Sequence, residues 1–357
     1  MKITKTHKIV SPEGISYNAK LLKGYVALYV SNNFWIIAKG YKLYKYFPSD
    51  ETLQYFSRVK DTFNGFASIN KLSRRLLRAE ITHLYKFGDD WFCIARKGIF
   101  KYDSESKLFL LCCRINRGSR PMNLCQDSDG SIYFGEYFFN PNREEVNIFK
   151  SIDKGMSWNI AYTFKTGEIN HIHGVFNDNF TGKLWVFTGD DDKACIAGYT
   201  TDGFNTLIRE FEGKQAYRIC VPIFLKTGII YPTDSQYSPN TIRIIDRESK
   251  SITDLQSIQG SGIYAMDNGN LFAVSTTVEP SKVNQDQYSH LWYSFNGSEW
   301  NELCSFKKDA LKTTLFQFGS IRFPYYQEKS DYLVFTGRAI KELDQSTLII
   351  KASSLKR

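Results

Sequence analysis

Residues 151–158 read SIDKGMSW, which has the form S-x-D-x-G-x-x-W and follows a strand-like run at residues 146–150. This spacing is typical of the turn in a β-hairpin. The Asp153 carboxylate can accept hydrogen bonds from backbone N–H groups across the turn, and Gly155 can adopt the positive φ that such turns require. Trp158 follows the turn, where its ring can pack between neighbouring sheets. The octapeptide therefore predicts a tight hairpin turn anchored by one carboxylate and one aromatic ring.

Weaker copies of this turn recur along the chain. Residues 200–207 (TTDGFNTL) have a threonine in place of the serine and keep the aspartate and an apolar final residue. Residues 294–300 (SFNGSEW) keep the serine and the tryptophan. Less marked turns occur at matching places, at Asp50, Asp103, Asp246 and Asp344. The seven turns, centred on residues 50, 103, 153, 202, 246, 296 and 344, lie 44 to 53 residues apart. This spacing predicts an all-β chain of seven four-stranded antiparallel units, the blades of a β-propeller.

On these residues the sequence resembles the Asp-box, or BNR-repeat, β-propeller superfamily, which includes sialidases, other glycoside hydrolases, sortilin-type receptors and photosystem assembly factors. The resemblance implies that each Asp-box turn joins the third and fourth strands of a blade, and that Asp153 and Trp158 are structural. It does not extend to the sialidase mechanism. Residues 218–222 (RICVP) only partly resemble the sialidase Arg-Ile-Pro motif, because two residues separate Ile and Pro.

The composition fits one large domain. Of the 357 residues, 42% are hydrophobic and 15% aromatic, which favours strands over helices. We expect a single propeller over residues 1–357, with a short helical insert at about residues 68–80. The N-terminal strand, at about residues 3–10, should close the ring by pairing with the last blade.

Charge and targeting signals narrow the choice of partners. A net charge of +9 favours a polyanionic partner. No aromatic and basic pattern of RNA-binding type occurs, so we expect an acidic oligosaccharide or polysaccharide and no nucleic acid. No run approaches the ~18 apolar residues of a membrane span, and the N-terminal residues lack the apolar core of a signal peptide, so we expect a cytoplasmic protein. Seven cysteines without a CxxC pair predict buried free thiols.

The turn positions also predict which strand ends share one rim of the ring. If each turn joins the third and fourth strands, the first strands begin and the second strands end on the rim where propellers commonly bind ligands. In the fourth unit the four strands fall at residues 169–177, 183–188, 194–200 and 207–211. The residues predicted at these strand ends are rich in Arg, His, Asp, Glu and Tyr, which indicates a functional site on that rim.

The candidate site residues come from these strand ends. The candidate catalytic residues are His173, Glu136, Tyr137 and Asp190. The candidate substrate-binding residues are His171, Gln215, Arg218, Asp234, Arg322 and Arg338. The same rim should also carry His83, Asn123, Tyr264, Lys39, Arg96 and Thr276.

The two histidines raise the question of a metal. His171 and His173 are two residues apart in a predicted strand, so both imidazoles should lie on the same face. We expect no cofactor. A divalent metal held by the two histidines stays open as the alternative.

These features predict a carbohydrate-active propeller that acts on an acidic, uronate-type glycan, as a polysaccharide lyase or a glycoside hydrolase. A lyase would use His173 or Tyr137 as the base and Arg218 to neutralise the uronate carboxylate. A hydrolase would use Glu136 together with Asp190 or Asp234. The alternative function is that of a non-catalytic module that binds a glycan or a protein. The oligomeric state stays open.

Overall fold

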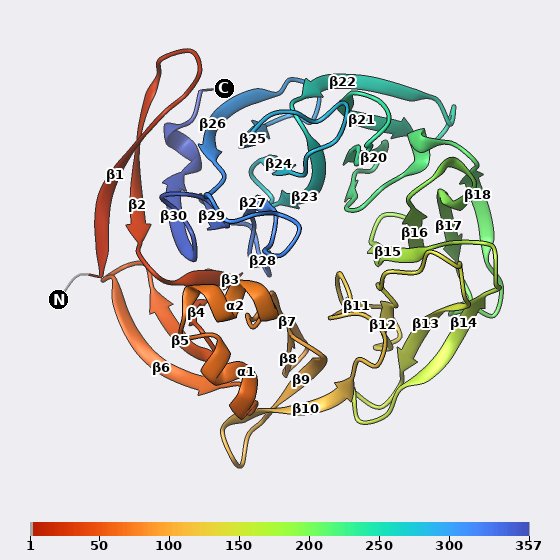
Figure 1. Cartoon of the computed structure of the whole chain (residues 1–357), viewed down its shortest axis with the longest axis horizontal. Coiled ribbons are helices and arrows are strands. Elements are labelled where there is room, and N and C mark those ends of the chain that lie inside the picture. The colour runs from red at the N-terminus through yellow and green to blue at the C-terminus, as the bar shows by residue number, and fades with distance from the viewer. Residues whose placement is uncertain (1–2, 357) are drawn as a thin grey trace.

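Thirty short strands run along the described chain, residues 3–356 of this computed structural model, and they form sheets arranged in a ring (Figure 1). Four of the sheets contain four antiparallel strands each, in chain order across the sheet. The first consists of β7 (His83–Phe87), β8 (Asp90–Ala95), β9 (Gly98–Asp103) and β10 (Leu108–Arg114). The second consists of β11 (Cys125–Gln126), β12 (Ile132–Gly135), β13 (Val146–Ser151) and β14 (Asn159–Phe164).

The next two sheets repeat the same plan. One consists of β15 (His171–Asp178), β16 (Lys183–Gly189), β17 (Ile196–Thr200) and β18 (Ile208–Glu212). The other consists of β19 (Ile223–Phe224), β20 (Gly228–Pro232), β21 (Asn240–Asp246) and β22 (Ile252–Ile258). Short 3₁₀ turns at Asp192–Ala194, Gln215–Tyr217 and Ala352–Ser354 complete the irregular segments. The four strands β15 to β18 lie within two residues of the positions predicted for the fourth unit, because the turn at residues 200–207 determines where the strands on either side begin and end.

The fifth sheet carries an additional strand at one edge. It consists of β28 (Tyr325–Tyr326), β3 (Val26–Val30), β4 (Trp35–Lys39), β5 (Lys42–Phe47) and β6 (Thr52–Arg58). The pairing of β28 with β3 is parallel, whereas the other four strands form an antiparallel meander.

The sixth sheet has nine strands and joins two of the predicted units. Its first part is β23 (Ser261–Asp267), β24 (Phe272–Val278), β25 (Tyr288–Ser294) and β26 (Asn301–Lys307). Its second part is β27 (Gly319–Arg322), β29 (Tyr332–Arg338), β30 (Ser346–Lys351), β2 (Ser16–Leu22) and β1 (Thr4–Val10). β24 pairs with β27 through Thr277–Ser320 and Val278–Gly319, which joins the two parts into one sheet. The fold is an all-β propeller with four-stranded antiparallel blades, but the expected seven separate blades are not present as seven sheets, since β24 pairs directly with β27.

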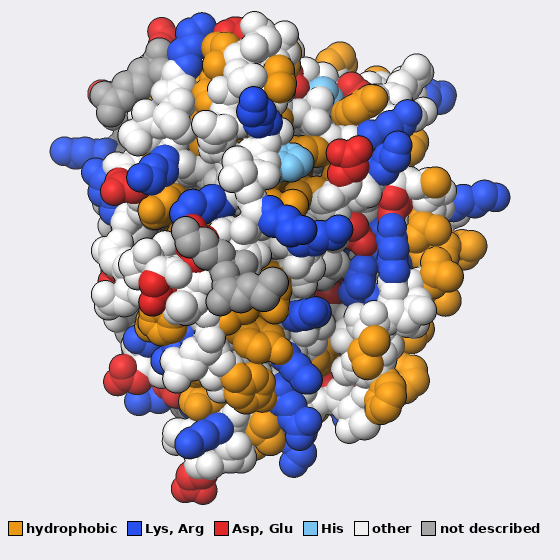
Figure 2. Space-filling model, turned by 90° about the vertical axis from the view of Figure 1, so that its left-hand side faces the viewer, with side chains coloured by type: hydrophobic (Ala, Val, Ile, Leu, Met, Phe, Trp, Pro, Cys, Tyr) orange, Lys and Arg blue, Asp and Glu red, His pale blue; other side chains and the backbone are white. Residues whose placement is uncertain are grey.

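The N-terminal residues close the ring through two strands. β2 pairs with β30, with Lys20 opposite Ile349, and β1 pairs with β2 on the outside. The predicted strand at residues 3–10 is therefore the outermost strand, and the contact with the last part of the chain is made by β2. Around these strands, Lys and Arg side chains lie among acidic and hydrophobic ones and do not gather into one patch on the face that Figure 2 shows.

The helical insert begins and ends earlier than predicted. It consists of α1 (Thr62–Ala67) and α2 (Lys71–Leu77), whose N-caps are the side chains of Asp61 and Asn70. Fully buried Arg75 of α2 pairs with Asp309 at 2.9 Å, which ties the insert to a segment far along the chain. Among the described residues no helix is long and apolar enough to cross a membrane. All seven cysteines are free and five are buried, which confirms the predicted buried thiols for those five.

The octapeptide at residues 151–158 forms the predicted turn, between β13 and β14. Asp153 Oδ1 accepts the backbone N–H groups of Met156 at 3.0 Å and Ser157 at 2.9 Å. The N–H of Gly155, at φ +82°, donates to Ser151 Oγ at 2.8 Å. The same bonds recur at the copies, where Asp202 accepts the N–H of Thr206 at 3.0 Å and Asn296 accepts that of Ser298 at 3.0 Å.

The turn at Asp344 differs from the prediction. It joins β29 and β30, the second and third strands of its part of the sheet, and not the third and fourth. The reason is that the fourth strand of this part, β2, comes from the N-terminus. Asp344 accepts the N–H of Ala339 at 2.8 Å and pairs with Arg74 at 2.9 Å.

The substitution Gly155→Val tests the structural role of the octapeptide. A Cβ at Gly155 would lie 2.6 Å from Cε1 of Phe92 on the neighbouring sheet, and the φ is unfavourable for any L side chain. Strain and overpacking together should lower the free energy of unfolding by about 2–5 kcal/mol. Gly167→Val is the matched control, because Gly167 has a φ of +90° with nothing within 4 Å of the added Cβ. Equal losses in urea unfolding would contradict the packing role of Gly155.

Candidate functional site

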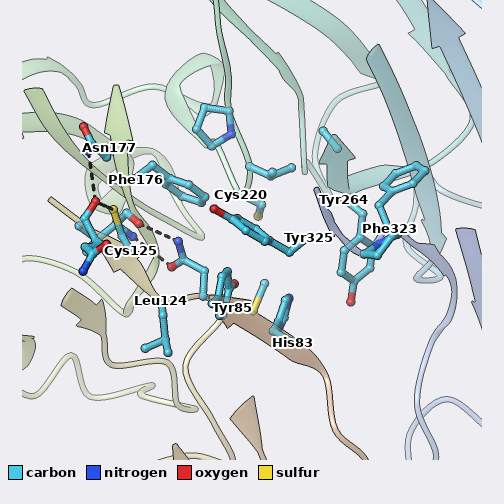
Figure 3. A pocket seen from close by; sticks show the side chains of 18 of the residues that line it. His83, Tyr85, Leu124, Cys125, Phe176, Asn177, Cys220, Tyr264, Phe323 and Tyr325 are labelled. Atoms are coloured by element: carbon cyan, nitrogen blue, oxygen red, sulfur yellow. Dashed lines mark hydrogen bonds between the residues drawn. The ribbon is translucent and has the colours of Figure 1, made fainter. Parts of the chain in front are cut away.

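A cavity of about 530 Å³ lies where the innermost strands converge. Its wall includes residues from β7, β11, β15 and β23, and Figure 3 shows many of these side chains around it. Much of the wall is aromatic, and polar groups are concentrated in a few places. The labelled lining residues are His83, Tyr85, Leu124, Cys125, Phe176, Asn177, Cys220, Tyr264, Phe323 and Tyr325. Such a cavity can enclose a small ligand.

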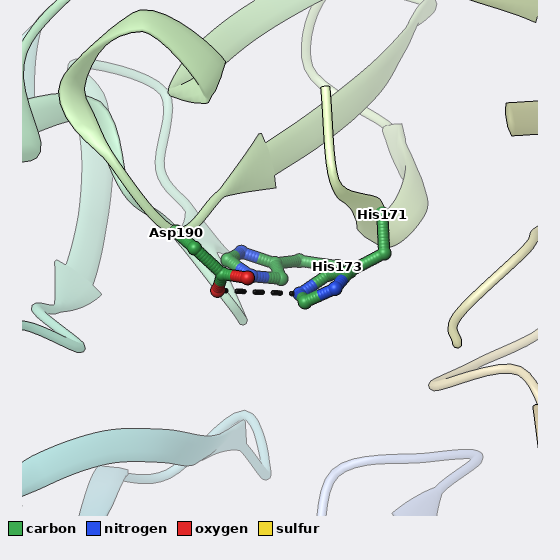
Figure 4. A group of neighbouring side chains, drawn as sticks. All are labelled: His171, His173 and Asp190. Atoms are coloured by element: carbon green, nitrogen blue, oxygen red, sulfur yellow. Dashed lines mark ion pairs between the residues drawn. The ribbon is translucent and has the colours of Figure 1, made fainter. Parts of the chain in front are cut away.

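The two histidines stand at the start of β15, and both are buried. The pairing register of β15 with β16 shifts between Ile172 and Gly174, so His173 is the extra residue of a β-bulge. The two imidazole rings lie 5.1 Å apart between centroids. Nε2 of His171 lies 3.5 Å from Oδ1 of Asp190, which directly follows β16 (Figure 4). Of these three residues, His173 also lines the cavity.

The proton on His173 can be placed from its partner. Nδ1 lies 3.0 Å from the backbone carbonyl oxygen of Ile219, which can only accept, so Nδ1 carries the proton and Nε2 has a lone pair. Cys220 Sγ also lies 3.5 Å from this Nδ1, and its thiol donates to Oδ2 of Asp234 at 3.3 Å. Burial, and then the charges of His171 and Arg218, lower the pKa of His173 to about 3. Burial also lowers the pKa of His171. Both imidazoles are therefore neutral at neutral pH.

Arg218 pairs with two acids of the protein, so its guanidinium group is not free to bind the carboxylate of a substrate. Its Nη2 pairs with Asp190 at 3.2 Å and with Asp234 at 3.0 Å, and its Nη1 donates to the carbonyl oxygen of Asp190 at 3.0 Å. Although burial alone would lower it, the pKa of Arg218 is raised by the charges of Asp234, Cys220 and Asp190. Gln215 supports the same loop, because its Nε2 donates to the carbonyl of Asp190 at 2.9 Å.

Glu136 and Tyr137, adjacent in sequence, face different surroundings. Glu136 pairs with Arg117, whose Nε donates at 2.9 Å, and it accepts the N–H of Asn147 at 2.9 Å in a separate pocket of about 220 Å³. The structure therefore does not bring the Glu136 carboxylate together with His171, His173 and Asp190, because this side chain is held by Arg117. The Tyr137 ring instead packs on His171, with 4.3 Å between centroids, and burial raises the pKa of its phenol.

Arg322 and Arg338 lie in a second cluster, around buried Glu80. Arg338 pairs with Glu80, and its Nε donates to Gln317 at 2.7 Å. Nη1 of Arg322 lies 3.7 Å from the same Glu80 oxygen. The three candidate substrate-binding arginines, Arg218, Arg322 and Arg338, thus lie in two separate clusters, and Arg218 and Arg338 already pair with acids of the protein.

Glu279 interacts electrostatically with Asp234 and Arg218, and it is not among the candidates predicted from the sequence. It directly follows β24, in the same kind of position as Asp190 and Asp234, whereas the prediction placed Thr276 there. Burial, and then the charge of Asp234, raise the pKa of Glu279 to about 7. Gln236 Nε2 donates to its Oε1 at 2.9 Å. A carboxyl group with such a pKa can exchange protons near neutral pH.

Two groups of side chains among the described residues have the donors to hold a metal ion. They are His171, His173 and Asp190, and His173, Cys220 and Asp234, and within each group the ligand atoms lie within 4.8 Å of one another. The first group fits better, because Nδ1 of His173 is engaged with Ile219 and the Cys220 thiol donates to Asp234. The donors of this group run against the expectation of no cofactor.

The pH dependence of stability tests the neutral state of the half-buried His83. Burial, and then the charges of Arg322 and Arg120, lower the pKa of His83 to about 3. The unfolded chain takes up this proton near pH 6.5, so stability should fall as the pH drops below that value. Between pH 6.5 and 5.0 the contribution is roughly 2 kcal/mol, and it should vanish in His83→Asn. Urea unfolding of both proteins at the two pH values measures the difference, and parallel losses would contradict this assignment.

Comparison with known proteins supports the fold and leaves the function open. No protein-family model and no curated protein sequence matches the chain. An oligogalacturonate lyase from Vibrio parahaemolyticus has a similar structure, with a TM-score of 0.63, 8% identity, and coverage of 98% of this chain and 97% of that one. An oligogalacturonate lyase in complex with manganese is similar with a TM-score of 0.63 and 7% identity, and the match covers 99% of this chain and 98% of that one. A chain of the mitotic checkpoint complex is similar with a TM-score of 0.54 and 8% identity, and the match covers 91% of this chain and 88% of that one. The propeller fold is thus shared with proteins of unrelated roles.

Proposed function

We propose that this propeller is a lyase for acidic, uronate-containing oligosaccharides, with its site beside the central cavity. One observation carries the proposal: His171, His173 and Asp190 place three ligand atoms within 4.8 Å of one another, and His173 faces a cavity of about 530 Å³. The likeness to two oligogalacturonate lyases supports a uronate-acting propeller at the level of the fold. The net charge of +9 is compatible with an acidic ligand.

The three side chains fit a divalent metal ion. Two imidazoles and one carboxylate are ligands that manganese, iron and zinc accept. The bond from Nδ1 of His173 to the carbonyl of Ile219 leaves Nε2 for the ion, an arrangement that metal-binding histidines usually have. A bound ion would neutralise the uronate carboxylate and so acidify the neighbouring C–H bond.

The carboxylates favour a lyase over a glycoside hydrolase. A hydrolase needs two carboxyl groups that flank the scissile bond. Here Asp190 and Asp234 both pair with Arg218, and Glu136 pairs with Arg117 in another pocket. An elimination needs only one base, together with a group that stabilises negative charge on the uronate.

We propose Glu279 as the base, because it directly follows β24 and interacts electrostatically with Asp234 and Arg218 beside the two histidines. Its carboxylate removes the proton from the carbon next to the uronate carboxylate, and the electron pair forms a carbon–carbon double bond. The bond between the next carbon and the glycosidic oxygen breaks, and that oxygen takes up a proton to become a hydroxyl group. A pKa of about 7 leaves much of Glu279 ionised at neutral pH while it stays strongly basic for a carboxylate.

The blade count belongs to the same proposal. We propose that the nine-stranded sheet comprises two blades, β23 to β26 and β27 with β29, β30, β2 and β1, which gives seven blades in all. The turns at Asp153, Asp202 and Asn296 would then be Asp boxes in the sense of that superfamily.

Calorimetric titration tests the proposed ligand. A galacturonic acid trimer should bind in the presence of Mn²⁺, and a neutral galactose trimer should not. Mn²⁺ alone should bind to the wild type and to the control His7→Gln, and much more weakly to His173→Gln. Equal binding of the charged and neutral trimers would contradict the proposed substrate class. Undiminished Mn²⁺ binding by His173→Gln would contradict the metal site.

A further inference from the structure

Two arginines beside the cavity have donor groups without protein partners. Arg120 lies in the loop before β11 and lines the cavity together with His83 and Tyr264. Arg322 ends β27, and its guanidinium carbon lies 5.3 Å from the centre of the Tyr264 ring. Within residues 3–356, Nη1 of Arg120 and both Nε and Nη2 of Arg322 are buried without a hydrogen-bond partner. Buried donors of this kind are rare, because an unpaired polar group loses its hydration without compensation.

The acid next to these arginines is shared. Glu80 Oε1 lies 3.7 Å from Nη1 of Arg322 and also pairs with Arg338. The Glu80 oxygens further accept the side-chain amides of Gln317 at 3.2 Å and Gln345 at 3.1 Å. The Glu80 carboxylate therefore contacts two guanidinium groups, and its other hydrogen-bond acceptor positions are taken by the two glutamine amides. The cluster has an excess of positive charge.

The ionisation of the neighbouring groups agrees with this excess. Burial, and then the charge of Arg322, lower the pKa of Arg120. Burial and the charges of the same two arginines keep the imidazole of His83 neutral. The surroundings of Arg120 and Arg322 therefore favour a negative charge, and the cavity is the place from which a ligand could supply it.

We propose that Arg120 and Arg322 form an anion-binding subsite that takes a carboxylate group of the ligand, with Tyr264 beside it. Guanidinium groups bind carboxylates through paired, charge-assisted hydrogen bonds, and a buried guanidinium with free donors is ready for such a bond. The inference deepens the proposed function and rests on it for the source of the anion, a uronate residue of the oligosaccharide. Free inorganic phosphate offers the same chemistry, so the experiment includes it.

The test compares Arg120→Gln and Arg322→Gln with Arg243→Gln, a control on β21 whose arginine pairs with Asp254. Melting temperatures are measured without ligand and with a galacturonic acid trimer, a neutral galactose trimer or inorganic phosphate, and affinities are measured by calorimetry. Without ligand, the two variants should melt at or above the wild-type temperature, since each loses a buried charge that lacks a full partner. Both should bind the acidic trimer more than about tenfold more weakly, as expected when a charge-assisted bond is removed. Arg243→Gln should bind like the wild type.

The outcomes separate this inference from the proposed function. If the acidic trimer binds the wild type and both variants equally, the subsite is wrong and the uronate substrate stands. If the trimer fails to bind the wild type while phosphate raises the melting temperature of the wild type but not of the variants, the subsite stands and the substrate is wrong. If no anion stabilises the wild type, both are wrong. A lower melting temperature of both variants without ligand would show that the arginines serve the fold, against the subsite.

Discussion

Glu279→Gln should lower turnover on an acidic oligosaccharide by about 10²–10⁴-fold, the usual contribution of a general base. Glutamine has nearly the same shape and cannot accept the proton, so binding of the oligosaccharide should change much less. The matched control is Glu136→Gln, because Glu136 pairs with Arg117 away from the central cavity. Its turnover should equal that of the wild type in whatever fraction is folded. Initial rates and calorimetric affinities of the three proteins give the comparison.

The pH profile provides a second readout for Glu279. The base must be ionised, and its pKa is raised to about 7. The value of kcat/KM should therefore fall about tenfold for each pH unit below 7 and level off above it. In Glu279→Gln the residual rate should lose this limb of the profile. An unchanged profile in the variant, or full turnover, would assign the base to another residue.

Deletion of residues 1–22 should abolish cooperative folding. The deletion removes β1 and β2 and so exposes the edge of β30, which pairs with β2 through Lys20, Leu21 and Leu22. It also removes the buried side chains Ile9, Tyr17, Ala19 and Leu22 from the apolar clusters. Burial of each large apolar side chain contributes about 1.5–3 kcal/mol, and a protein has only about 5–15 kcal/mol of net stability.

The control for this deletion is the removal of residues 1–12 alone. It takes away the outermost strand and Ile9 but leaves β2 paired with β30. This shorter deletion should melt cooperatively at a lower temperature, whereas the longer one should give no cooperative transition in circular dichroism. A cooperative melt of the longer deletion near the wild-type temperature would contradict the closure by β2.

The turn motif made much of the fold predictable. The hydrogen bonds around Asp153, Asp202 and Asn296 are local, so a few residues specify the turn between the third and fourth strands. The position of the turn then predicts where the strands before and after it lie in the sequence. Asp344 was assigned wrongly because the sheet it belongs to is completed by the N-terminal strands. No local pattern shows that two ends of a chain meet, and the pairing of β24 with β27 is likewise non-local.

The candidate site was predictable only where strands fix the side chains. His171 and His173 lie together at the start of β15, as their spacing of two residues predicts, although a bulge at His173 interrupts the regular alternation. Asp190 follows the partner strand β16. Glu136 fits the same rule, but its carboxylate pairs with Arg117, and the sequence has no pattern that predicts this partner. Arg120 lies in a loop, where no period predicts the direction of a side chain. Glu279 lies one residue beyond β24, and a prediction based on the true end of that strand would have found it.

The most direct test of the proposed function is the ultraviolet absorbance of a reaction with a galacturonic acid oligomer and Mn²⁺. A lyase leaves a carbon–carbon double bond conjugated with the carboxylate at the new end of the product, which absorbs in the ultraviolet. We expect the absorbance to rise with the wild type and with Glu136→Gln, and to stay near the background with Glu279→Gln. New reducing ends without this absorbance would show a hydrolase, and tight binding without either product would show a module that only binds the oligosaccharide.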